Sequence, residues 1–361
     1  MALSEHRAAP SERLPVGGER GHEQSGGLFV PTSARSAKGV VMTYAEAGAA
    51  ALAAAMRDDP RIVALGEDLG RGGIFGQYTG LLSEFGSERV IDTPISEATI
   101  VGAGVGMALA GLKPVVEMRV ADFALCAMDE IVNQAAKNRF MFGGQGRVPL
   151  VMRLPIGVWS ASAAQHSQSL EAWFAHLPGV VVVTPSTPQD NFSMLRAALQ
   201  ADDPVVYMEH KELWSQHGEV NVDQVATLGR AQARRNGSGL TIVTWSAAVH
   251  TVLQAADALE RDGLDVGVID LGSLWPWDRE TVFAACARTR RLLVVHEAVQ
   301  VGGFGAEVAA SAAEATGCRV ARLGAPRVPV GYAATLEAQA RISVDAVVQA
   351  ARALCANAMP A

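Results

Sequence analysis

Glu97 is the first side chain whose type and position could do chemistry. It closes the segment Asp92–Glu97, which follows a short apolar run and opens a helical pattern. Because ligands bind open α/β sheets at the carboxyl ends of the strands, a carboxylate placed there could contact one. The spacing alone favours a simpler role, in which Glu97 stabilises its helix by about 0.3–1 kcal/mol through the helix dipole.

His166 and Phe123 are two further candidates. His166 lies in Gln165–Ser169, after a loop of small and polar residues, and histidine is the side chain best suited to proton transfer near neutral pH. Phe123 follows an apolar run that ends near Glu117, so its ring could stack on a flat ligand. Taken singly, a loop histidine bonded to backbone and a phenylalanine packed in the core are the more common cases.

Several other kinds of site are not expected, because the sequence lacks their motifs. There is no GxSxG nucleophile elbow, no Walker phosphate loop and no local Cys–His pair. The glycines after Glu97 have the spacing GxGxG inside a helical stretch, whereas a dinucleotide site needs GxGxxG directly after a strand. Zinc sites and disulfide frameworks are not expected because the four cysteines are far apart: Cys126, Cys286, Cys318 and Cys355.

The composition narrows the partners and the compartment. The formal net charge is −7 and no run of lysine or arginine stands out, so nucleic acid is not an expected partner. No apolar run approaches the roughly 20 residues that a membrane helix needs. Residues 1–40 are rich in Ser, Gly, Pro, Arg and Glu and are expected to form a disordered tail. They lack an apolar signal region and contain several glutamates, so we expect a cytoplasmic protein.

The elements that must position these side chains follow an alternating pattern. Short apolar strands alternate with helices, which predicts parallel sheets covered on both faces. A polar segment over residues 234–239 interrupts the pattern, and the alternation then restarts. We therefore predict two doubly wound, mostly parallel α/β domains, over residues 41–233 and 240–361. The helices expected in the first domain cover residues 44–56, 100–110, 123–142 and 188–201.

Taken together, these stretches resemble the beta subunits of 2-oxo acid dehydrogenases and acetoin dehydrogenases. The resemblance runs from about residue 41 to the C-terminus, and it is most specific in RVIDTPISE (Arg89–Glu97) and QHSQSLEAW (Gln165–Trp173). It implies a transketolase-type pyrimidine-binding domain followed by a transketolase-type C-terminal domain. The other matching segments are Met42–Ala47, Gly66–Asp68, Val101–Gly111, Met128–Lys137, Gly143–Gln145, His296–Ala298 and Gly302–Glu307.

The resemblance implies roles for the candidate residues around thiamine diphosphate. Glu97 would bond the N1′ atom of the aminopyrimidine ring, Phe123 would pack on that ring, and Ile95 would support the bent cofactor. Arg119, often Gln or Met in relatives, would add a positive charge beside the cofactor or the substrate carboxylate. His166 would donate a proton to the lipoyl dithiolane during reductive acylation and could help to bind the substrate carboxylate.

The resemblance also implies partners. The Gly-Asp-Gly…Asn pattern that holds magnesium and the diphosphate is absent, so an alpha subunit would supply that half of the site. The expected assembly has two alpha and two beta chains, docks on a lipoyl acyltransferase core, and leaves the lone chain inactive. Relatives often bind a structural potassium ion; the matching positions are Leu150, Ala198, Leu199, Ala201 and Asp203.

The expected function is therefore oxidative decarboxylation of a small 2-oxo acid with acyl transfer to a lipoyl group. Met128–Gly144 and Gln165–Pro178 favour pyruvate or acetoin over branched-chain 2-oxo acids, although one methylene is worth only about 1–3 kcal/mol in a pocket. Trp159, in a loop that is often glycine-rich in relatives, would narrow the substrate entrance. A transketolase-like carboligating synthase and a non-catalytic scaffold are the alternatives from other classes.

Overall fold

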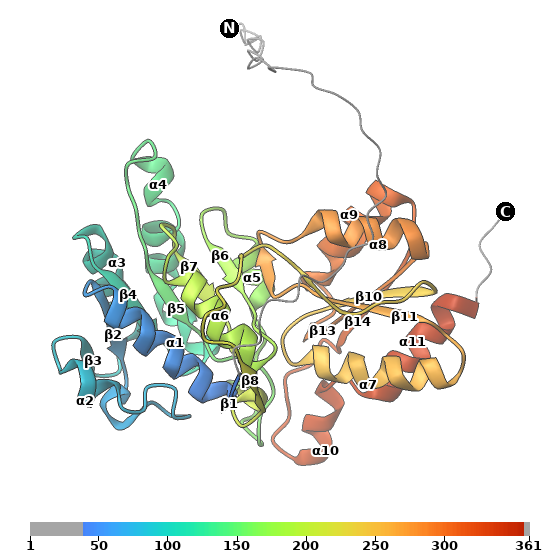
Figure 1. The fold of residues 1–361 in the computed structure, drawn as a ribbon, viewed down its shortest axis with the longest axis horizontal. Coiled ribbons are helices and arrows are strands. Elements are labelled where there is room, and N and C mark those ends of the chain that lie inside the picture. Colours follow the sequence, from blue (N-terminus) through green and yellow to red (C-terminus); the bar gives the residue numbers. More distant parts are fainter. Residues whose placement is uncertain (1–38, 357–361) are drawn as a thin grey trace, which may run out of the picture. The chain divides into compact units, whose positions relative to one another are not determined.

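The computed structural model describes residues 39–356. The tail predicted over residues 1–40 therefore lies, except for its last two residues, outside the described part. Within that part, two mixed, mostly parallel sheets with helices on both faces make up an α/β fold (Figure 1). No helix of the described part is long and apolar enough to cross a membrane.

The first sheet has seven strands in the order β12-β6-β7-β5-β4-β2-β3. All neighbouring pairs are parallel except the edge pair of β12 and β6. The bounds are β2 (Ile62–Gly66), β3 (Val90–Asp92), β4 (Lys113–Glu117), β5 (Val151–Arg153), β6 (Val181–Val183), β7 (Val205–Tyr207) and β12 (Ser273–Trp275).

Alternate side chains of this sheet enter two different cores. Val115 of β4 packs in a cluster with the helices α1 (Tyr44–Asp58) and α6 (Pro188–Ala198), which lie together on one face of the sheet. Val116 packs on the other face with α3 (Glu97–Leu109). Because both faces are buried, the strands are continuously apolar, as expected for a parallel sheet.

The second sheet has the order β14-β13-β10-β11-β9, with only β9 antiparallel. Helices α7 and α11 pack on one face and helices α8 and α9 on the other. The bounds are β9 (Gln232–Arg235), β10 (Leu240–Thr244), β11 (Val266–Asp270), β13 (Arg291–Val299), β14 (Arg319–Ala325), α7 (Ala248–Arg261), α8 (Arg279–Thr289), α9 (Gly305–Thr316) and α11 (Val344–Ala356).

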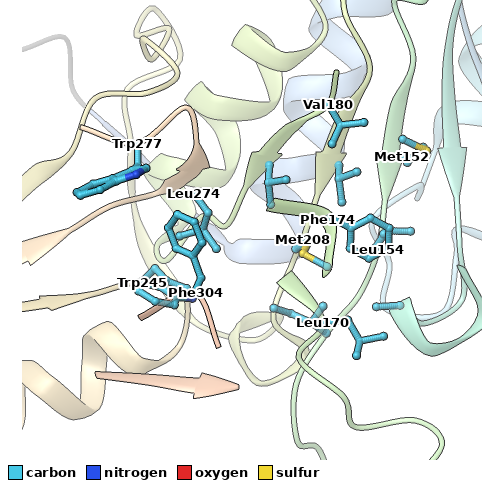
Figure 2. Packing of buried hydrophobic residues seen from close by; sticks show 14 of the residues in the cluster. Met152, Leu154, Leu170, Phe174, Val180, Met208, Trp245, Leu274, Trp277 and Phe304 are labelled. Carbon is cyan, nitrogen blue, oxygen red and sulfur yellow. The ribbon is translucent and has the colours of Figure 1, made fainter. Parts of the chain in front are cut away.

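One apolar cluster continues from the first sheet into the second (Figure 2). Phe174 and Leu170 of the first domain belong to the same cluster as Trp245 and Phe304 of the second. The edge strand β12 follows β11 in the chain and yet pairs with β6 of the first sheet. The two domains are therefore joined by a shared apolar core and by the pairing of β12 with β6.

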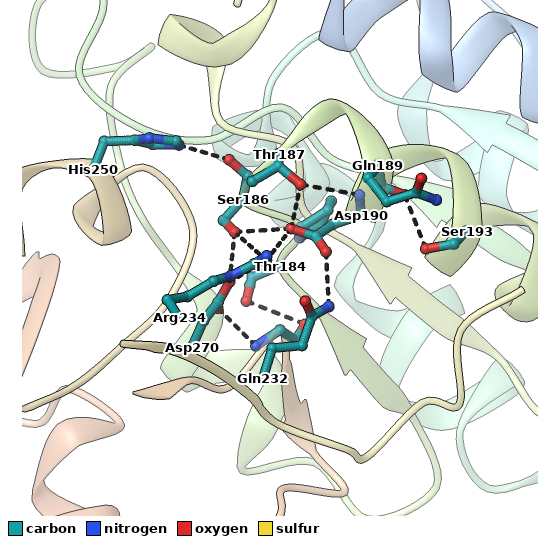
Figure 3. Close-up of polar contacts among 12 residues, drawn as sticks. Thr184, Ser186, Thr187, Gln189, Asp190, Ser193, Gln232, Arg234, His250 and Asp270 are labelled. Carbon is teal, nitrogen blue, oxygen red and sulfur yellow. Dashed lines mark hydrogen bonds and ion pairs between the residues drawn. The ribbon is translucent and has the colours of Figure 1, made fainter. Parts of the chain in front are cut away.

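A buried polar cluster forms a second link between the domains (Figure 3). Arg234 of β9 pairs with Asp270 at 2.8 Å and also with Asp190, which lies in the first turn of α6. Ser186 Oγ lies within hydrogen-bond distance of both carboxylates, 3.0 Å from Asp190 Oδ2 and 2.5 Å from Asp270 Oδ2, and can donate its one hydrogen to either. Burial raises the pKa of Asp270 even though Arg234 opposes the shift. The two carboxylates, one from each domain, therefore depend on the same arginine of the second domain for their charge compensation.

Most predicted elements lie within a few residues of their observed bounds, but two predictions were wrong. The helix expected over residues 123–142 is a 3₁₀ segment (Ala121–Ala127), a π-helical segment (Glu130–Ala135) and a short α4 (Asn138–Met141). The wide turn shows in the bond from Ala136 N–H to Ile131 O, five residues back. The polar break at residues 234–239 overlaps β9, which is an edge strand of the second sheet.

Candidate active site

Glu97 is the first residue of α3 and lies at the carboxyl end of the first sheet. The preceding strand β3 ends at Asp92, and the loop between them exposes 76% of Ile95. The Glu97 side chain is half-buried and has no hydrogen bond or ion pair within the described residues 39–356. A carboxylate in this position is free to accept a hydrogen bond from a ligand.

Glu67 is close enough to both Glu97 and Arg119 for their charges to act on it. Glu67 directly follows β2, which pairs with β3, and Arg119 lies two residues beyond β4, on the other side of β2. Burial raises the pKa of Glu67, the negative charge of Glu97 raises it further, and Arg119 opposes both. Arg119 Nη1 also lies 3.3 Å from Asp68 Oδ2. The ends of three neighbouring strands thus bring two carboxylates and a guanidinium together.

The structure also brings Phe123 and His166 together. Their ring centroids are 5.1 Å apart and their planes are inclined by 80°, so one ring meets the other edge-on. The phenylalanine is half-buried, whereas the histidine is exposed. Gln168 Nε2 donates to Asp122 Oδ1 at 2.7 Å, which joins the neighbours of the two rings.

Comparison with known proteins decides the family. The description "Transketolase, pyrimidine binding domain" matches residues 40–216, and "Transketolase, C-terminal domain" matches residues 229–347. The chain is 40% identical to the 2-oxoisovalerate dehydrogenase subunit beta of Bacillus subtilis, over 87% of this chain and 98% of that protein. It is a member of the 2-oxo acid and acetoin dehydrogenase beta-subunit family.

Other members agree with this placement, and one solved structure shares the fold. A mitochondrial pyruvate dehydrogenase E1 component subunit beta-2 of Oryza sativa is 39% identical, over 91% of this chain and 90% of that protein. An acetoin:2,6-dichlorophenolindophenol oxidoreductase subunit beta of Cupriavidus necator is 38% identical, over 78% and 88%. A split-gene transketolase, described as an inactive beta4 tetramer, shares the fold with a TM-score of 0.74 at 23% identity, over 87% and 98%.

Three acidic residues near the site were missed in the sequence of this beta subunit. Glu67 could have been found, because it directly follows a predicted strand. Glu297, in β13, accepts from Val158 N–H at 2.8 Å across 139 residues, and Glu337 accepts from Ala161 N–H at 2.6 Å across 176 residues. Contacts at such separations leave no local pattern, so nothing in the sequence marked these two as neighbours of the His166 loop.

One of the predicted potassium ligands lies beside a cationic side chain. The Leu199 carbonyl oxygen lies 3.3 Å from Lys113 Nζ, and the Asp203 carboxylate pairs with Arg139. The resemblance implies a site made of backbone carbonyl oxygens, of which the Leu199 oxygen faces an ammonium group, and the potassium site stays a prediction. Within residues 39–356 there is also no group of three or more His, Cys, Asp or Glu side chains arranged to hold a metal.

Proposed function

We propose that this chain is the beta subunit of a thiamine-diphosphate-dependent 2-oxo acid dehydrogenase and supplies the pyrimidine half of a shared active site. The observation that carries the proposal is the unpartnered, half-buried carboxylate of Glu97, which stands beside Glu67 at the carboxyl end of the sheet. It lies inside the segment that matches the transketolase pyrimidine-binding domain.

The side chains proposed for this half of the site suit the cofactor's aminopyrimidine ring. Glu97 would hold a proton shared with the ring nitrogen N1′, Phe123 would cover a ring face, and exposed Ile95 would give an apolar contact. Arg119 would oppose the negative charge that gathers at the two carboxylates. When bound, thiamine diphosphate supplies the electron sink for loss of CO₂ from a 2-oxo acid.

His166 is proposed to give a proton to the lipoyl dithiolane during acyl transfer. Its imidazole is exposed and rests edge-on against Phe123, so a substrate carried on a flexible arm can reach it. Histidine is the side chain best suited to holding and releasing a proton near neutral pH. This role assigns Glu97 and His166 to different half-reactions.

The rest of the site is proposed to come from an alpha subunit that holds magnesium and the diphosphate, in an assembly of two alpha and two beta chains. The sequence of this chain has no Gly-Asp-Gly…Asn pattern, so we expect no turnover from it alone. A lipoyl acyltransferase core is the proposed acceptor of the acyl group.

Pyruvate or acetoin is the proposed substrate, and a branched-chain 2-oxo acid is the second candidate. The resemblance at Met128–Gly144 and Gln165–Pro178 favours the former. The 40% identity to a 2-oxoisovalerate dehydrogenase subunit favours the latter, beside 38–39% for the pyruvate and acetoin relatives. A carboligating synthase is the alternative from another class, since the solved neighbour is a transketolase.

The test is reconstitution with a co-expressed alpha subunit. Dye reduction is followed with pyruvate, acetoin and 3-methyl-2-oxobutanoate, with and without thiamine diphosphate, and with the lone chain as control. We expect activity only in the pair and only with cofactor, and the preferred compound names the substrate. A stable pair that binds the cofactor and reduces no dye with any of the three would overturn the dehydrogenase proposal in favour of a synthase.

A further inference from the structure

The loop that carries His166 has a strained backbone. Ser160, Ala161 and Ala163 have φ angles of 44°, 56° and 59°, which non-glycine residues rarely adopt. Such conformations persist only where surrounding contacts hold them. The contacts around residues 157–169 should therefore decide where the imidazole stands.

Glu297 of the second domain holds both ends of this loop. Its Oε1 accepts from Val158 N–H at 2.8 Å and from Ser169 Oγ at 3.3 Å. Its Oε2 lies 2.9 Å from His210 Nε2. Because His210 Nδ1 accepts from Glu212 N–H, Nε2 carries the hydrogen and donates it to Glu297. A cross-domain carboxylate thus bridges the two ends of the loop.

Glu337 holds the strained middle of the loop. It ends the short helix α10 (Ala334–Glu337) and is only 8% exposed. Its Oε2 accepts from the N–H of Ala161 at 2.6 Å, and its Oε1 accepts from Arg341 Nη2 at 2.8 Å. Arg341 also pairs with Glu212 at 2.5 Å, so the carboxylate is itself fixed from a second side.

His166 is held directly as well. The buried Lys211 donates from Nζ to the His166 carbonyl oxygen. Burial lowers the pKa of Lys211. The negative charges of Asp122, Glu297 and Glu337 oppose this shift. The three carboxylates therefore offset part of the effect of burial on the amine that anchors the histidine.

We infer that Glu337, together with Glu297, is a positioning residue of the second domain that holds the His166 loop in the conformation for acyl transfer. The inference rests on the proposed function, because it takes His166 as the proton donor to the lipoyl group. It gives the second domain a part in the chemistry of the first, although neither carboxylate touches the imidazole.

The test compares Glu337→Leu and Glu337→Gln with the wild type in the reconstituted alpha–beta complex with thiamine diphosphate. Acylation of a lipoyl domain and reduction of an artificial dye are measured on each. Glu337→Leu should lower acylation by about tenfold or more and dye reduction by much less, because small displacements of a catalytic group are costly. Glu337→Gln keeps an oxygen acceptor for Ala161 N–H and should recover most of the acylation.

Glu307→Ala is the matched control. Glu307 belongs to the same domain and pairs with Arg279 at 3.4 Å on the surface, away from the contacts of residues 157–169. It should leave the ratio of acylation to dye reduction at the wild-type value. An unchanged ratio in Glu337→Leu, or a ratio that Glu337→Gln fails to raise, would overturn the inference.

Amide hydrogen exchange separates failure of this inference from failure of the proposed function. If the wild-type complex acylates no lipoyl domain, the proposed function fails and the exchange of residues 157–169 still tests the restraint. We expect this loop to exchange at least tenfold faster in Glu337→Leu and Arg341→Gln, and at the wild-type rate in Glu307→Ala. Equal exchange in all variants would contradict any role of Glu337 in holding the loop.

Discussion

At the scale of single residues, pattern and resemblance led to two side chains that the structure brings together and to a third that has no partner. Phe123 and His166 were predicted separately and their rings are in contact. Glu97 was predicted as a ligand contact, and its carboxylate has no partner in the described part of the chain. Glu297 and Glu337 could not be predicted, because each reaches the loop from another domain.

Replacing His166 by Gln should separate the two half-reactions. We expect acylation of a lipoyl domain to fall by about 100-fold or more, the usual contribution of a positioned proton donor, while dye reduction falls far less. The rates are compared in the reconstituted complex, with His176→Gln as the control outside the site. Equal losses in both assays would show that His166 serves decarboxylation or folding instead.

Glu117 gives the folded protein a pH-dependent stability. Burial raises its pKa to about 7, against the opposing charge of Arg153, and Tyr78 donates to it at 2.7 Å. The folded protein keeps this proton up to about pH 7, whereas the unfolded chain releases it near the ordinary glutamate value of about 4.3. The contribution of Glu117 to the free energy of unfolding should therefore fall as the pH rises between these values.

The measurement is urea unfolding of the wild type and Glu117→Gln between pH 5 and 8. The variant has no proton to lose at this position, so its stability relative to the wild type should rise with pH across this window. A constant difference between the two proteins would contradict a shifted pKa for Glu117.

At the scale of elements, α3 positions Glu97, and its glycines decide how closely it packs. A Cβ at Gly104 would lie 2.7 Å from Val116 Cγ2 and 3.2 Å from Leu150 Cδ1, whereas a Cβ at Gly106 would meet nothing within 4 Å. Close packing of α3 on the sheet therefore requires glycine at position 104 but not at position 106. Sequence periodicity predicted this helix, but it could not distinguish 3₁₀ and π turns from an α-helix over residues 123–142.

Gly104→Ala should destabilise the protein by about 1–3 kcal/mol, because the added methyl overpacks the contact between α3 and β4. Gly106→Ala is the matched control on the same helix and should stabilise it by about 0.5–1 kcal/mol through lower backbone entropy in the unfolded state. Chemical unfolding of both variants gives the free energies. A loss of stability in Gly106→Ala equal to that in Gly104→Ala would contradict the packing argument.

At the scale of the whole molecule, two domains that the sequence separates are joined in the structure. The alternation of strands and helices predicted two parallel sheets. It did not predict β9, which overlaps the polar break at residues 234–239, and it did not predict β12. Both are short edge strands whose pairing depends on a distant partner. The link through Arg234, Asp190 and Asp270 is likewise visible only in three dimensions (Figure 3).

Arg234→Ala should therefore lower the free energy of unfolding by about 3–5 kcal/mol, because it leaves two buried carboxylates without their counter-charge. Urea unfolding measures this loss. The control is Arg352→Ala, which removes an exposed ion pair with Asp262 and should cost at most about 1 kcal/mol. Similar losses in the two variants would mean that the cluster between the domains contributes no more to the free energy of unfolding than a surface ion pair does.

Glu97→Gln in the reconstituted complex tests the central claim most directly. An amide cannot hold the proton that the carboxyl group shares with the pyrimidine ring, so kcat for dye reduction should fall by at least about 100-fold. The assembly, followed by size-exclusion chromatography, should stay intact, and the exposed Glu88→Gln should keep wild-type activity. If Glu97→Gln turned over within about twofold of the wild type, the claim that Glu97 forms this beta subunit's half of the active site would be contradicted.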